Sequence, residues 1–517
     1  MSFPIATGNS GNDVGTSVST FSDGSSIITG IFSGTVSFGE TNLTSSPEGP
    51  FGYDIFIAKL DNNGNYLWAR QAGGSSADFG NCVTTLSDGS SIITGSFQGT
   101  ASFGTTNLNA SGANDIFIAK LDSDGKFLWA KQAGGSDGDI AYAISSLSDG
   151  SSIITGSFDG NASFGSTTLT SAGNADIFIA KLDSSGNFLW AKQAGGSDYE
   201  AGASISSLSD GSSIITGNFQ ANASFGSTNL TSAGKNDVFI AKLDTDGNYL
   251  WAKQAGGSER DIGHGISSLS DGSSIITGFF EGNSTFGSTN LTSAGKLDIF
   301  ISKLDSNGNF LWAKQAGGTS TDLGYAVSTL SNGDSIITGQ FQGTAQFGST
   351  SLNSSGGADA FIAKFDNDGN YLWSKQAGSI SGSEEGLSIS TLSNGSSITT
   401  GHFESTASFG ESALTSSGMV DIFISALDAD GNWLTSLAPS LTSATYDISS
   451  GVLTATGSNF VANSGSNNDI DSSKLTLTGD GSNTFTLTSD DVELTSDTAF
   501  SVTLSAADQL QISGFLN

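Results

Sequence analysis

A tryptophan recurs along this chain at a nearly fixed distance, and no other feature constrains the fold as strongly. Successive tryptophans are separated by 61 residues in five intervals and by 60 in the last. They mark copies of one segment, which reads DIFISKLDSNGNFLWAKQAGG at residues 298–318. Self-similarity at such a period indicates a repeat architecture. The seven tryptophans are Trp68, Trp129, Trp190, Trp251, Trp312, Trp373 and Trp433.

One repeat of about 61 residues predicts four β-strands. In residues 256–316, IGHGISSLSDG and SSIITGFF form a first hairpin, and DIFISKLD and FLWAKQAGG form a second hairpin around SNGN. The link between the hairpins has 17 residues in most copies and predicts a small hairpin or a packed plug. Because the strands are apolar on both faces, each sheet is expected to pack between two similar sheets.

Seven such sheets predict a closed ring, an all-β, seven-bladed β-propeller of four-stranded antiparallel blades over residues 1–438. A unit that cannot bury both faces alone is stable between neighbours, and a linear array would need polar end caps that the first and last copies lack. We expect each blade to come from contiguous chain, although FPIAT near the N-terminus could add an edge strand to the seventh. With 70 glycines and 4 prolines, almost no helix is expected.

Residues 439–517 form the second predicted domain. Segments such as GVLTATGSNFV, SKLTLTGDG and TAFSVTLS alternate and turn like a small antiparallel β-sandwich whose last strand lies near the chain end. The segment fits either one unit of a longer array or an incomplete domain.

The repeat motifs DIFIAKLD, LWAKQAGG and SSIITGSF resemble the bacterial seven-bladed β-propeller (SBBP) repeat family. The C-terminal segment is similar to Ig-like repeats of bacterial, especially cyanobacterial, surface proteins. These resemblances imply a propeller followed by an Ig-like sandwich in a secreted or surface-attached protein. They imply little about activity, because propellers host many functions.

The charge distribution argues against two classes of partner. The formal net charge is −33, and 12 of the 17 basic residues occupy two fixed places in the repeat. No basic patch is then left for nucleic acid or an anionic membrane. The chain shows neither a signal peptide at its N-terminus nor a run long enough to insert in a membrane, so its export route is unknown. We expect a monomeric propeller located outside the cell or on its surface.

An acidic residue stands at the same place in every copy, at the crossover into the next sheet. One interpretation is a metal-binding collar near the mouth of the central channel. The other is that each carboxylate accepts backbone N–H groups and ties neighbouring blades together. Calcium is conceivable, but no specific motif indicates it, and the DxDGN segments fit tight hairpin turns better than calcium loops. The acids are Asp13, Asp78, Asp139, Glu200, Asp261, Asp322 and Glu384.

Two positions differ between otherwise similar copies and predict a binding site. Three residues after the acid, the copies read Thr16, Asn81, Tyr142, Ala203, His264, Tyr325 and Leu387. At the end of the second strand they read Ile31, Ser96, Ser157, Asn218, Phe279, Gln340 and His402. Aromatic and polar side chains there could shape a pocket, although drift on a solvated surface explains the variation equally well. The predicted binding residues are Asn81, Tyr142, His264, Tyr325, Phe279, Gln340 and His402.

No catalytic residues are predicted. The only histidines, His264 and His402, fall in different copies and in no metal-ligand spacing, and Cys82 is expected to be a small packed side chain. We therefore predict a non-catalytic binding or adhesion propeller without a cofactor, which recognises a glycan or a surface protein through its loop-rich face. The alternatives are a structural scaffold of a surface layer or matrix and a polysaccharide hydrolase or lyase.

Overall fold

The chain forms two compact units, and its described part is built almost entirely of β-strands. The computed structural model describes residues 3–46, 52–434, 440–458, 469–478, 484–492, 494 and 499–515. The first unit runs from Phe3 to Leu434, and Thr435 onward belongs to the second. The predicted boundary at 438/439 lies outside the described residues.

Strand pairing in the first unit gives seven sheets of four antiparallel strands, paired in chain order except in the last sheet, whose fourth strand is the first strand of the chain. The first strands are β2 (Val14–Thr20), β8 (Phe79–Thr85), β14 (Asp139–Ser146), β18 (Ala201–Ser207), β24 (Ile262–Ser268), β28 (Asp322–Thr329) and β32 (Glu385–Thr391). The second are β3 (Ser26–Phe32), β9 (Ser91–Phe97), β15 (Ser152–Phe164), β19 (Ser213–Phe219), β25 (Ser274–Phe286), β29 (Ser335–Phe347) and β33 (Ser397–Phe403). The third are β6 (Asp54–Leu60), β12 (Asp115–Leu121), β16 (Thr167–Leu182), β22 (Asp237–Leu243), β26 (Thr289–Leu304), β30 (Thr350–Phe365) and β36 (Asp421–Leu427). The fourth are β7 (Tyr66–Gly74), β13 (Phe127–Gly135), β17 (Phe188–Gly196), β23 (Tyr249–Gly257), β27 (Phe310–Gly318), β31 (Tyr371–Gly378) and β1 (Ile5–Thr7).

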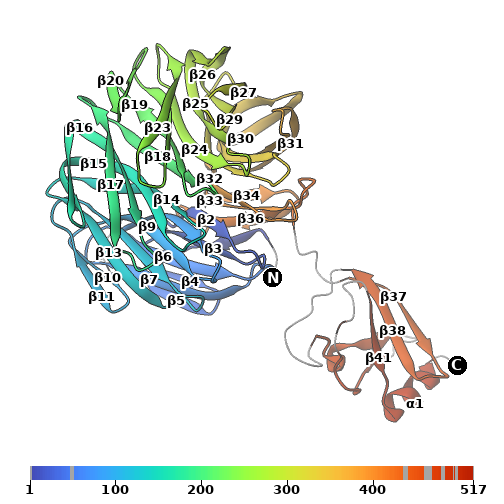
Figure 1. Ribbon diagram of the computed structural model, residues 1–517. Coiled ribbons are helices and arrows are strands. Elements are labelled where there is room, and N and C mark those ends of the chain that lie inside the picture. The colour runs from blue at the N-terminus through green and yellow to red at the C-terminus, as the bar shows by residue number, and fades with distance from the viewer. Residues whose placement is uncertain are drawn as a thin grey trace. The chain divides into compact units, whose positions relative to one another are not determined.

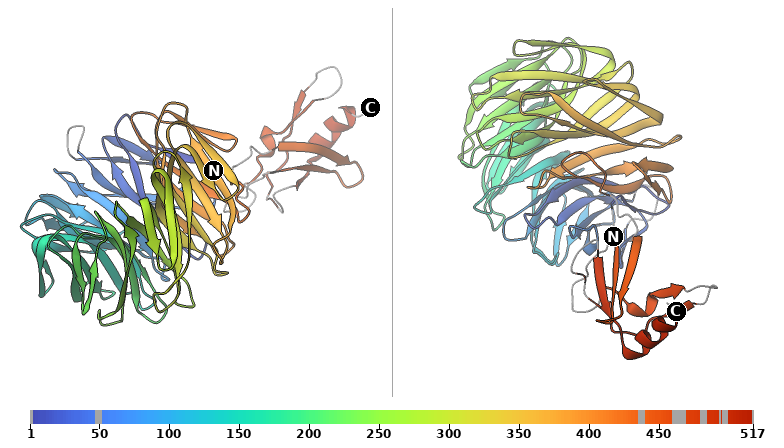
Figure 2. Two further views of the ribbon diagram at one scale, coloured as in Figure 1. Left: turned by 90° about the horizontal axis from the view of Figure 1, so that it is seen from above. Right: turned by 90° about the vertical axis from the view of Figure 1, so that its right-hand side faces the viewer.

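The first strands stand next to one another around a common axis, and β2 of the first sheet contacts β32 of the last. In Figure 1 the blue strands β2 and β3 accordingly lie beside the orange strands β32, β33 and β36, and the two views of Figure 2 agree. The arrangement is of the propeller type, as the sequence predicted.

A belt of hydroxyl groups joins each first strand to the next. At every step a Ser or Thr hydroxyl is hydrogen-bonded to a hydroxyl of the neighbouring strand, at 2.8–3.2 Å, including the step from the last sheet back to the first. A linear array would leave the terminal hydroxyls of such a series unpaired, whereas a ring pairs all of them. The pairs are Ser19–Thr85, Thr84–Ser146, Ser145–Ser207, Ser206–Ser268, Ser267–Thr329, Ser328–Thr391 and Ser390–Thr20.

The last sheet is not built from contiguous chain. Its fourth strand is β1, which pairs antiparallel with β36, Ile5 opposite Ile424. The expectation that every sheet comes from one continuous segment is therefore wrong for this sheet, and the alternative of an edge strand from the N-terminus is confirmed. The reason is geometric: a strand from one chain end that completes the sheet at the other end closes the ring with main-chain hydrogen bonds.

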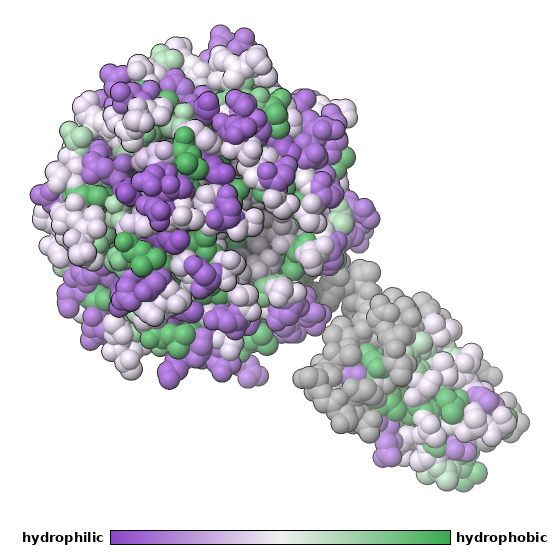
Figure 3. Space-filling view, viewed as in Figure 1, coloured by the Kyte–Doolittle hydropathy of each residue, from purple (hydrophilic) through white to green (hydrophobic). Residues whose placement is uncertain are grey.

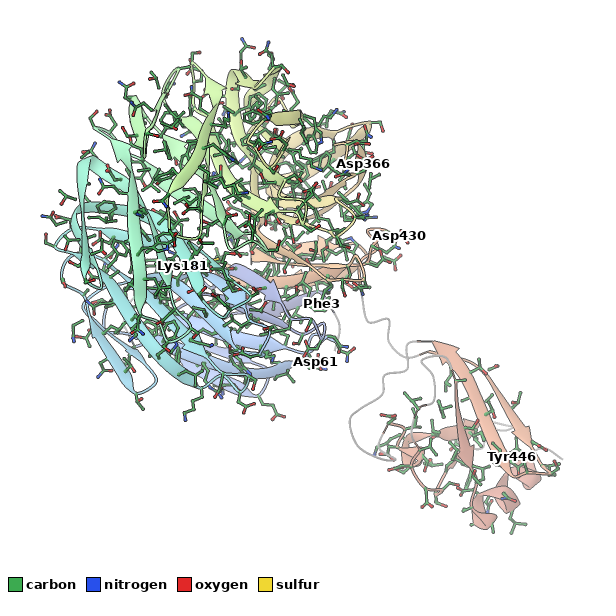
Figure 4. All side chains as sticks on the ribbon, viewed as in Figure 1. Phe3, Asp61, Lys181, Asp366, Asp430 and Tyr446 are labelled. Carbon is green, nitrogen blue, oxygen red and sulfur yellow. The ribbon has the colours of Figure 1, made fainter. Side chains whose placement is uncertain are left out.

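The last tryptophan does not occupy the place of the other six. Six indole Nε1–H groups donate to a main-chain carbonyl in the hairpin turn of the next sheet, as Trp190 does to Thr245 at 3.1 Å. Trp433 instead packs on Gly410, where the other copies place Tyr or Phe, such as Tyr66 on Gly39. The nearly equal spacing of the tryptophans therefore assigned Trp433 to the wrong place in the repeat. Phe3, labelled with Asp61 in Figure 4, takes the tryptophan place at the closing junction, against Gly64 of the Asp61–Asn65 turn.

The links between the hairpins fold into small hairpins of their own, as predicted. In four copies these are separate strand pairs, and in the other three they extend the second and third strands. In the second copy the small hairpin also pairs with the fourth strand of the preceding sheet, Ala101 opposite Gly74. The separate pairs are β4 (Thr35–Phe38) with β5 (Thr41–Thr44), β10 (Thr100–Phe103) with β11 (Thr106–Asn109), β20 (Asn222–Phe225) with β21 (Thr228–Thr231), and β34 (Thr406–Phe409) with β35 (Ser412–Thr415).

The core of the first unit lies between the sheets. All seven residues of β12, DIFIAKL, are buried, because alternate side chains enter the contacts with the sheets on both sides. Ile116 and Ile118 pack in one core cluster, and Phe117 and Ala119 pack in another. The DxDGN segments form tight turns held by their own aspartates: Asp244 Oδ1 accepts N–H from Asp246 at 2.9 Å and from Asn248 at 2.8 Å.

The second unit contains a helix that the sequence analysis did not expect. Strands β37 (Ser440–Asp447), β38 (Val452–Ser458) and β41 (Ala499–Thr503) form one sheet, and β39 (Thr476–Thr478) pairs with β40 (Thr484–Thr486). A 3-10 turn covers Ser472–Lys474, and helix α1 covers Ala506–Phe515. Strand β41 confirms the predicted strand TAFSVTLS, and the helix follows it in residues for which no element was predicted. Ser505 caps the helix by accepting N–H from Asp508 at 3.2 Å, and Ile512 reaches the core around Leu453 and Phe500.

Candidate functional site

A β-bulge interrupts each first strand at the same place, and the extra residues of all seven bulges line one cavity. In β24, for example, the register shifts between Gly263 and Gly265, which leaves His264 without a partner opposite. A bulge re-aims the side chain of its extra residue and bends the strand. The seven residues are Thr16, Asn81, Tyr142, Ala203, His264, Tyr325 and Leu387.

The cavity lies on the axis of the ring, since every first strand contributes to its wall, and its volume is about 590 Å³. This volume is typical of sites for small ligands or for single units of a polymer. Tyr142, Tyr199, His264 and Tyr325 provide an aromatic part of the wall, and Thr16 and Asn81 provide polar groups. None of the residues that line it is an Asp, Glu, Lys or Arg, so the cavity suits an uncharged ligand.

Residues at the ends of the second strands support the wall from behind. Gln340 Nε2 donates to the Tyr325 hydroxyl at 3.0 Å, and the Phe279 ring lies 5.5 Å from the His264 ring. Tyr325 and His264 are also in contact, with ring centroids 5.4 Å apart. These contacts hold the aromatic side chains in fixed positions, which lowers the entropic cost of binding.

His264, Tyr142 and Tyr325 of the cavity wall are uncharged at neutral pH, and Glu385 lies beside Tyr325 but is not part of the wall. Burial lowers the pKa of His264 to about 4 and raises the pKa of Tyr142 to about 12. Burial, and after it the nearby Glu385, raises the pKa of Tyr325. The site therefore offers aromatic surface and neutral hydrogen-bonding groups and no fixed charge.

The structure brings together most of the predicted binding residues. Asn81, Tyr142, His264 and Tyr325 line the cavity, whereas Phe279 and Gln340 stand behind it. His402 is not part of the wall: it lies opposite Glu385 in the last sheet, and burial lowers its pKa to about 4.

Most residues of the wall were not predicted as binding residues, among them Tyr199, Asn218 and Cys82. Tyr199 precedes the acid of its crossover, Asn218 ends a second strand, and Cys82 follows a bulge. Asn218 belonged to the variable set and could have been chosen for its amide. Tyr199 could have been chosen because it is the one aromatic residue among the residues that directly precede the seven acids.

The seven predicted acids lie away from the cavity wall. They are fully buried, and each accepts backbone N–H groups: Asp322 Oδ2 accepts from Gly318 at 2.7 Å, and its Oδ1 accepts from Gln342 at 3.1 Å. The described residues contain no group of three or more His, Cys, Asp or Glu side chains that could hold a metal ion. The backbone contacts are those expected if each acid links neighbouring blades. A metal-binding role stays a prediction for Asp13, Asp78, Asp139, Glu200, Asp261, Asp322 and Glu384.

Comparison with known proteins assigns no family, because no family model matches the chain. An uncharacterised WD repeat-containing protein of Acanthamoeba polyphaga mimivirus is 22% identical over 446 residues, covering 68% of this chain and 31% of that protein. The regulatory protein FlaEY of Caulobacter vibrioides is 29% identical over 141 residues, covering 26% of this chain and 15% of that protein. The chain thus spans less than a third of the length of either relative.

Two solved structures align with most of this chain at very low identity. A puromycin hydrolase variant covers 86% of this chain with a TM-score of 0.39 and 8% identity, and 58% of that chain is covered. The C-terminal WD40 domain of Sif2 covers 81% with a TM-score of 0.37 and 8% identity, and 98% of that domain is covered. Because both scores are below 0.5, the propeller-type fold of this chain rests on its own strand pairing.

Proposed function

We propose that the protein is a non-catalytic binding protein, a seven-bladed propeller that holds an uncharged ligand in its axial cavity. The observation that carries the proposal is that the bulged residues of all seven first strands, which differ between otherwise similar copies, meet in one cavity. Selection that acts on a site would diversify these positions while the repeat around them stays uniform. The ligand is a neutral sugar unit or an uncharged peptide segment, since aromatic rings and neutral polar groups suit both.

The face of the first unit in view in Figure 3 offers no competing apolar site. On the face in view in Figure 3, hydrophobic residues of the Phe3–Leu434 unit are scattered and form no continuous patch. A flat apolar interface for a folded partner would require such a patch.

No helix of the described residues is long and apolar enough to cross a membrane.

We also propose a location and a family for the protein. The SBBP resemblance of the repeats and the Ig-like resemblance of the second unit support a place on the cell surface or outside the cell, with the second unit as spacer or attachment module. The alternatives are a scaffold, which predicts self-association of the protein without a ligand, and a glycan hydrolase or lyase, which predicts turnover that a His264→Ala variant loses.

A blocked cavity tests the proposal. Ala203 lines the cavity with a small side chain, so Ala203→Trp should fill part of it, whereas Ala110→Trp changes an alanine outside the wall. The intact protein and both variants are screened on a neutral glycan array and on a peptide display library. We expect ligands whose affinity falls at least tenfold in Ala203→Trp and stays unchanged in Ala110→Trp. Hits that both variants keep would show that the ligand binds elsewhere, and no hits on either screen would contradict the proposal.

Cys82 provides a second measurement, because it is the only cysteine and lies on the cavity wall. Burial raises the pKa of its thiol, so modification by a maleimide should be slow. A ligand in the cavity should slow it further in the unmodified protein. An unchanged rate at a saturating ligand concentration would place the ligand outside the cavity.

A further inference from the structure

A pair of buried carboxylic acids lies at each junction between neighbouring sheets. One member precedes the apolar run of a third strand, and the other stands at the crossover into the next sheet. All are at most 1% exposed. The pairs are Asp54–Asp78, Asp115–Asp139, Asp176–Glu200, Asp237–Asp261, Asp298–Asp322, Asp359–Glu384 and Asp421–Asp13.

The two carboxyl groups of a pair meet over a glycine. A Cβ atom on Gly317 would lie 2.9 Å from Asp322 Oδ2 and 3.1 Å from Asp298 Oδ1. At Gly134 the corresponding distances are 2.8 Å to Asp139 Oδ2 and 3.2 Å to Asp115 Oδ1. Both carboxyl groups therefore border the same glycine, and only a residue without a side chain fits beside them.

At six of the seven junctions an oxygen of the pair is buried without a hydrogen-bond partner among the described residues. At the Asp298–Asp322 junction this atom is Asp298 Oδ1. The exception is Asp237–Asp261, where the Ser232 hydroxyl donates to Asp237 Oδ1 at 3.1 Å and the Ser284 hydroxyl donates to Asp261 Oδ1 at 2.5 Å. A buried acceptor without a donor is costly, so each of the six junctions lacks at least one hydrogen.

No basic side chain compensates these acids. The charged groups that act on them are the partner acids themselves, together with Asp137 near Asp139 and Asp198 near Glu200. Gln side chains and backbone N–H groups supply the remaining contacts, as Gln132 does to Asp115. Two carboxylates buried side by side without a cation repel each other, and such pairs keep one proton between them.

We propose that each acid pair binds one proton, shared between its two carboxyl groups, so that the closed ring carries about seven protons which the unfolded chain releases. At six junctions the proton supplies a missing hydrogen bond, and at all seven it removes one of the two charges. Burial raises the pKa of Asp322 and of Glu384 to about 7, in agreement with a proton retained near neutral pH. Ca²⁺ would need about six to eight oxygen ligands, and the pair offers far fewer unpaired oxygens.

Infrared spectroscopy of the whole protein tests the proposal. At about pH 6 exposed carboxyl groups are ionised, so a protonated C=O band must come from buried acids. We expect a band equivalent to about seven carboxylic acids in the folded protein, absent at about pH 9 and in guanidinium chloride. Absence of the band at about pH 6 in the folded wild-type protein would overturn the proposal without any variant.

Single variants localise the proton. Asp322→Asn removes the acid of one junction and keeps its shape, so the band should fall by about a seventh. Asp305→Asn changes an exposed turn and should leave it unchanged. If millimolar Ca²⁺ abolishes the band and raises Tm at about pH 6 in the wild type but not in Asp322→Asn, the junctions are cation sites, and the proposal is wrong.

Discussion

Ile5 lies directly opposite Ile424 across the antiparallel pair of β1 and β36. The beginning of the first unit thereby completes the sheet of the last repeat, and the ring is closed by main-chain pairing and by burial of Ile5 and Phe3. A ring closed by three residues of strand should be sensitive to any change in them.

The first prediction concerns this closure. Ile5→Asn places an amide in a site that is 7% exposed and should destabilise the fold by about 2–4 kcal/mol. Ala6→Asn, in the same strand with an exposed side chain, is the control and should cost under about 0.5 kcal/mol. Chemical denaturation of the two variants measures the difference. Equal stabilities would mean that β1 is not needed for closure.

The second prediction separates the six equivalent tryptophans from the seventh. Trp190→Phe removes the hydrogen bond from Nε1 to Thr245 O and should cost about 1 kcal/mol or more. Trp433→Phe should cost less, because Phe127, Phe188 and Phe310 occupy the corresponding place in other copies. Denaturation midpoints of the two variants give the answer, and a larger loss for Trp433→Phe would contradict the assignment.

The third prediction concerns the glycine between paired acids. Gly317 has φ of 140°, and a methyl group there would overlap Asp298 and Asp322. Gly317→Ala should therefore destabilise by about 2 kcal/mol or more. A Cβ atom on Gly138 would meet no atom of the described residues within 4 Å beyond its chain neighbours, so Gly138→Ala should be close to neutral. Thermal unfolding compares the stabilities of the two variants. An unchanged Tm in Gly317→Ala would show that the junction has space for a methyl group.

The fourth prediction is a fall in stability as the pH rises above about 6. Burial raises the pKa of Asp139 and Glu200 to about 7 in the folded chain, so the folded chain binds more protons than the unfolded chain. Stability from these groups is fully present below the unfolded pKa values, near 4, and is lost as the pH rises through about 7.

A second set of groups limits stability in acid. Hydrogen bonds to Ser hydroxyls lower the pKa of exposed turn aspartates such as Asp23 and Asp271, and their contribution is lost as the pH falls through the lowered values. We therefore expect the highest Tm at about pH 5, with a decline on both sides. A Tm that rises steadily from pH 5 to pH 9 would contradict the assignment of raised pKa values.

Much of the fold followed from local pattern. The apolar run DIFIAKL, the glycine turns and the 61-residue period predicted four strands per repeat and small hairpins in the links. The same periodicity misassigned Trp433, because counting along the chain does not distinguish a residue at the tryptophan place from one two positions earlier. The helix was missed because no helical pattern was recognised after the strand TAFSVTLS, although Ser505 at the end of that segment caps the helix.

The site was predicted in part. Variation at equivalent positions selected Asn81, Tyr142, His264 and Tyr325, but pattern alone could not separate a pocket from drift on a surface. The structure separates them, since the bulges turn these side chains toward one axis. His402 was also chosen because its position varies between copies, but it lies outside the wall. Sequence variation does not show how a side chain packs.

The sequence by itself determined the repeat, its four strands and the faces they bury, because these depend on residues close together in the chain. Only the tertiary structure decided that Ile5 joins Ile424, that seven bulges share one cavity, and that Asp298 faces Asp322. Each of these relationships joins parts of the chain that belong to different repeats. Their geometry is set by how the sheets pack around the axis, which no single repeat encodes.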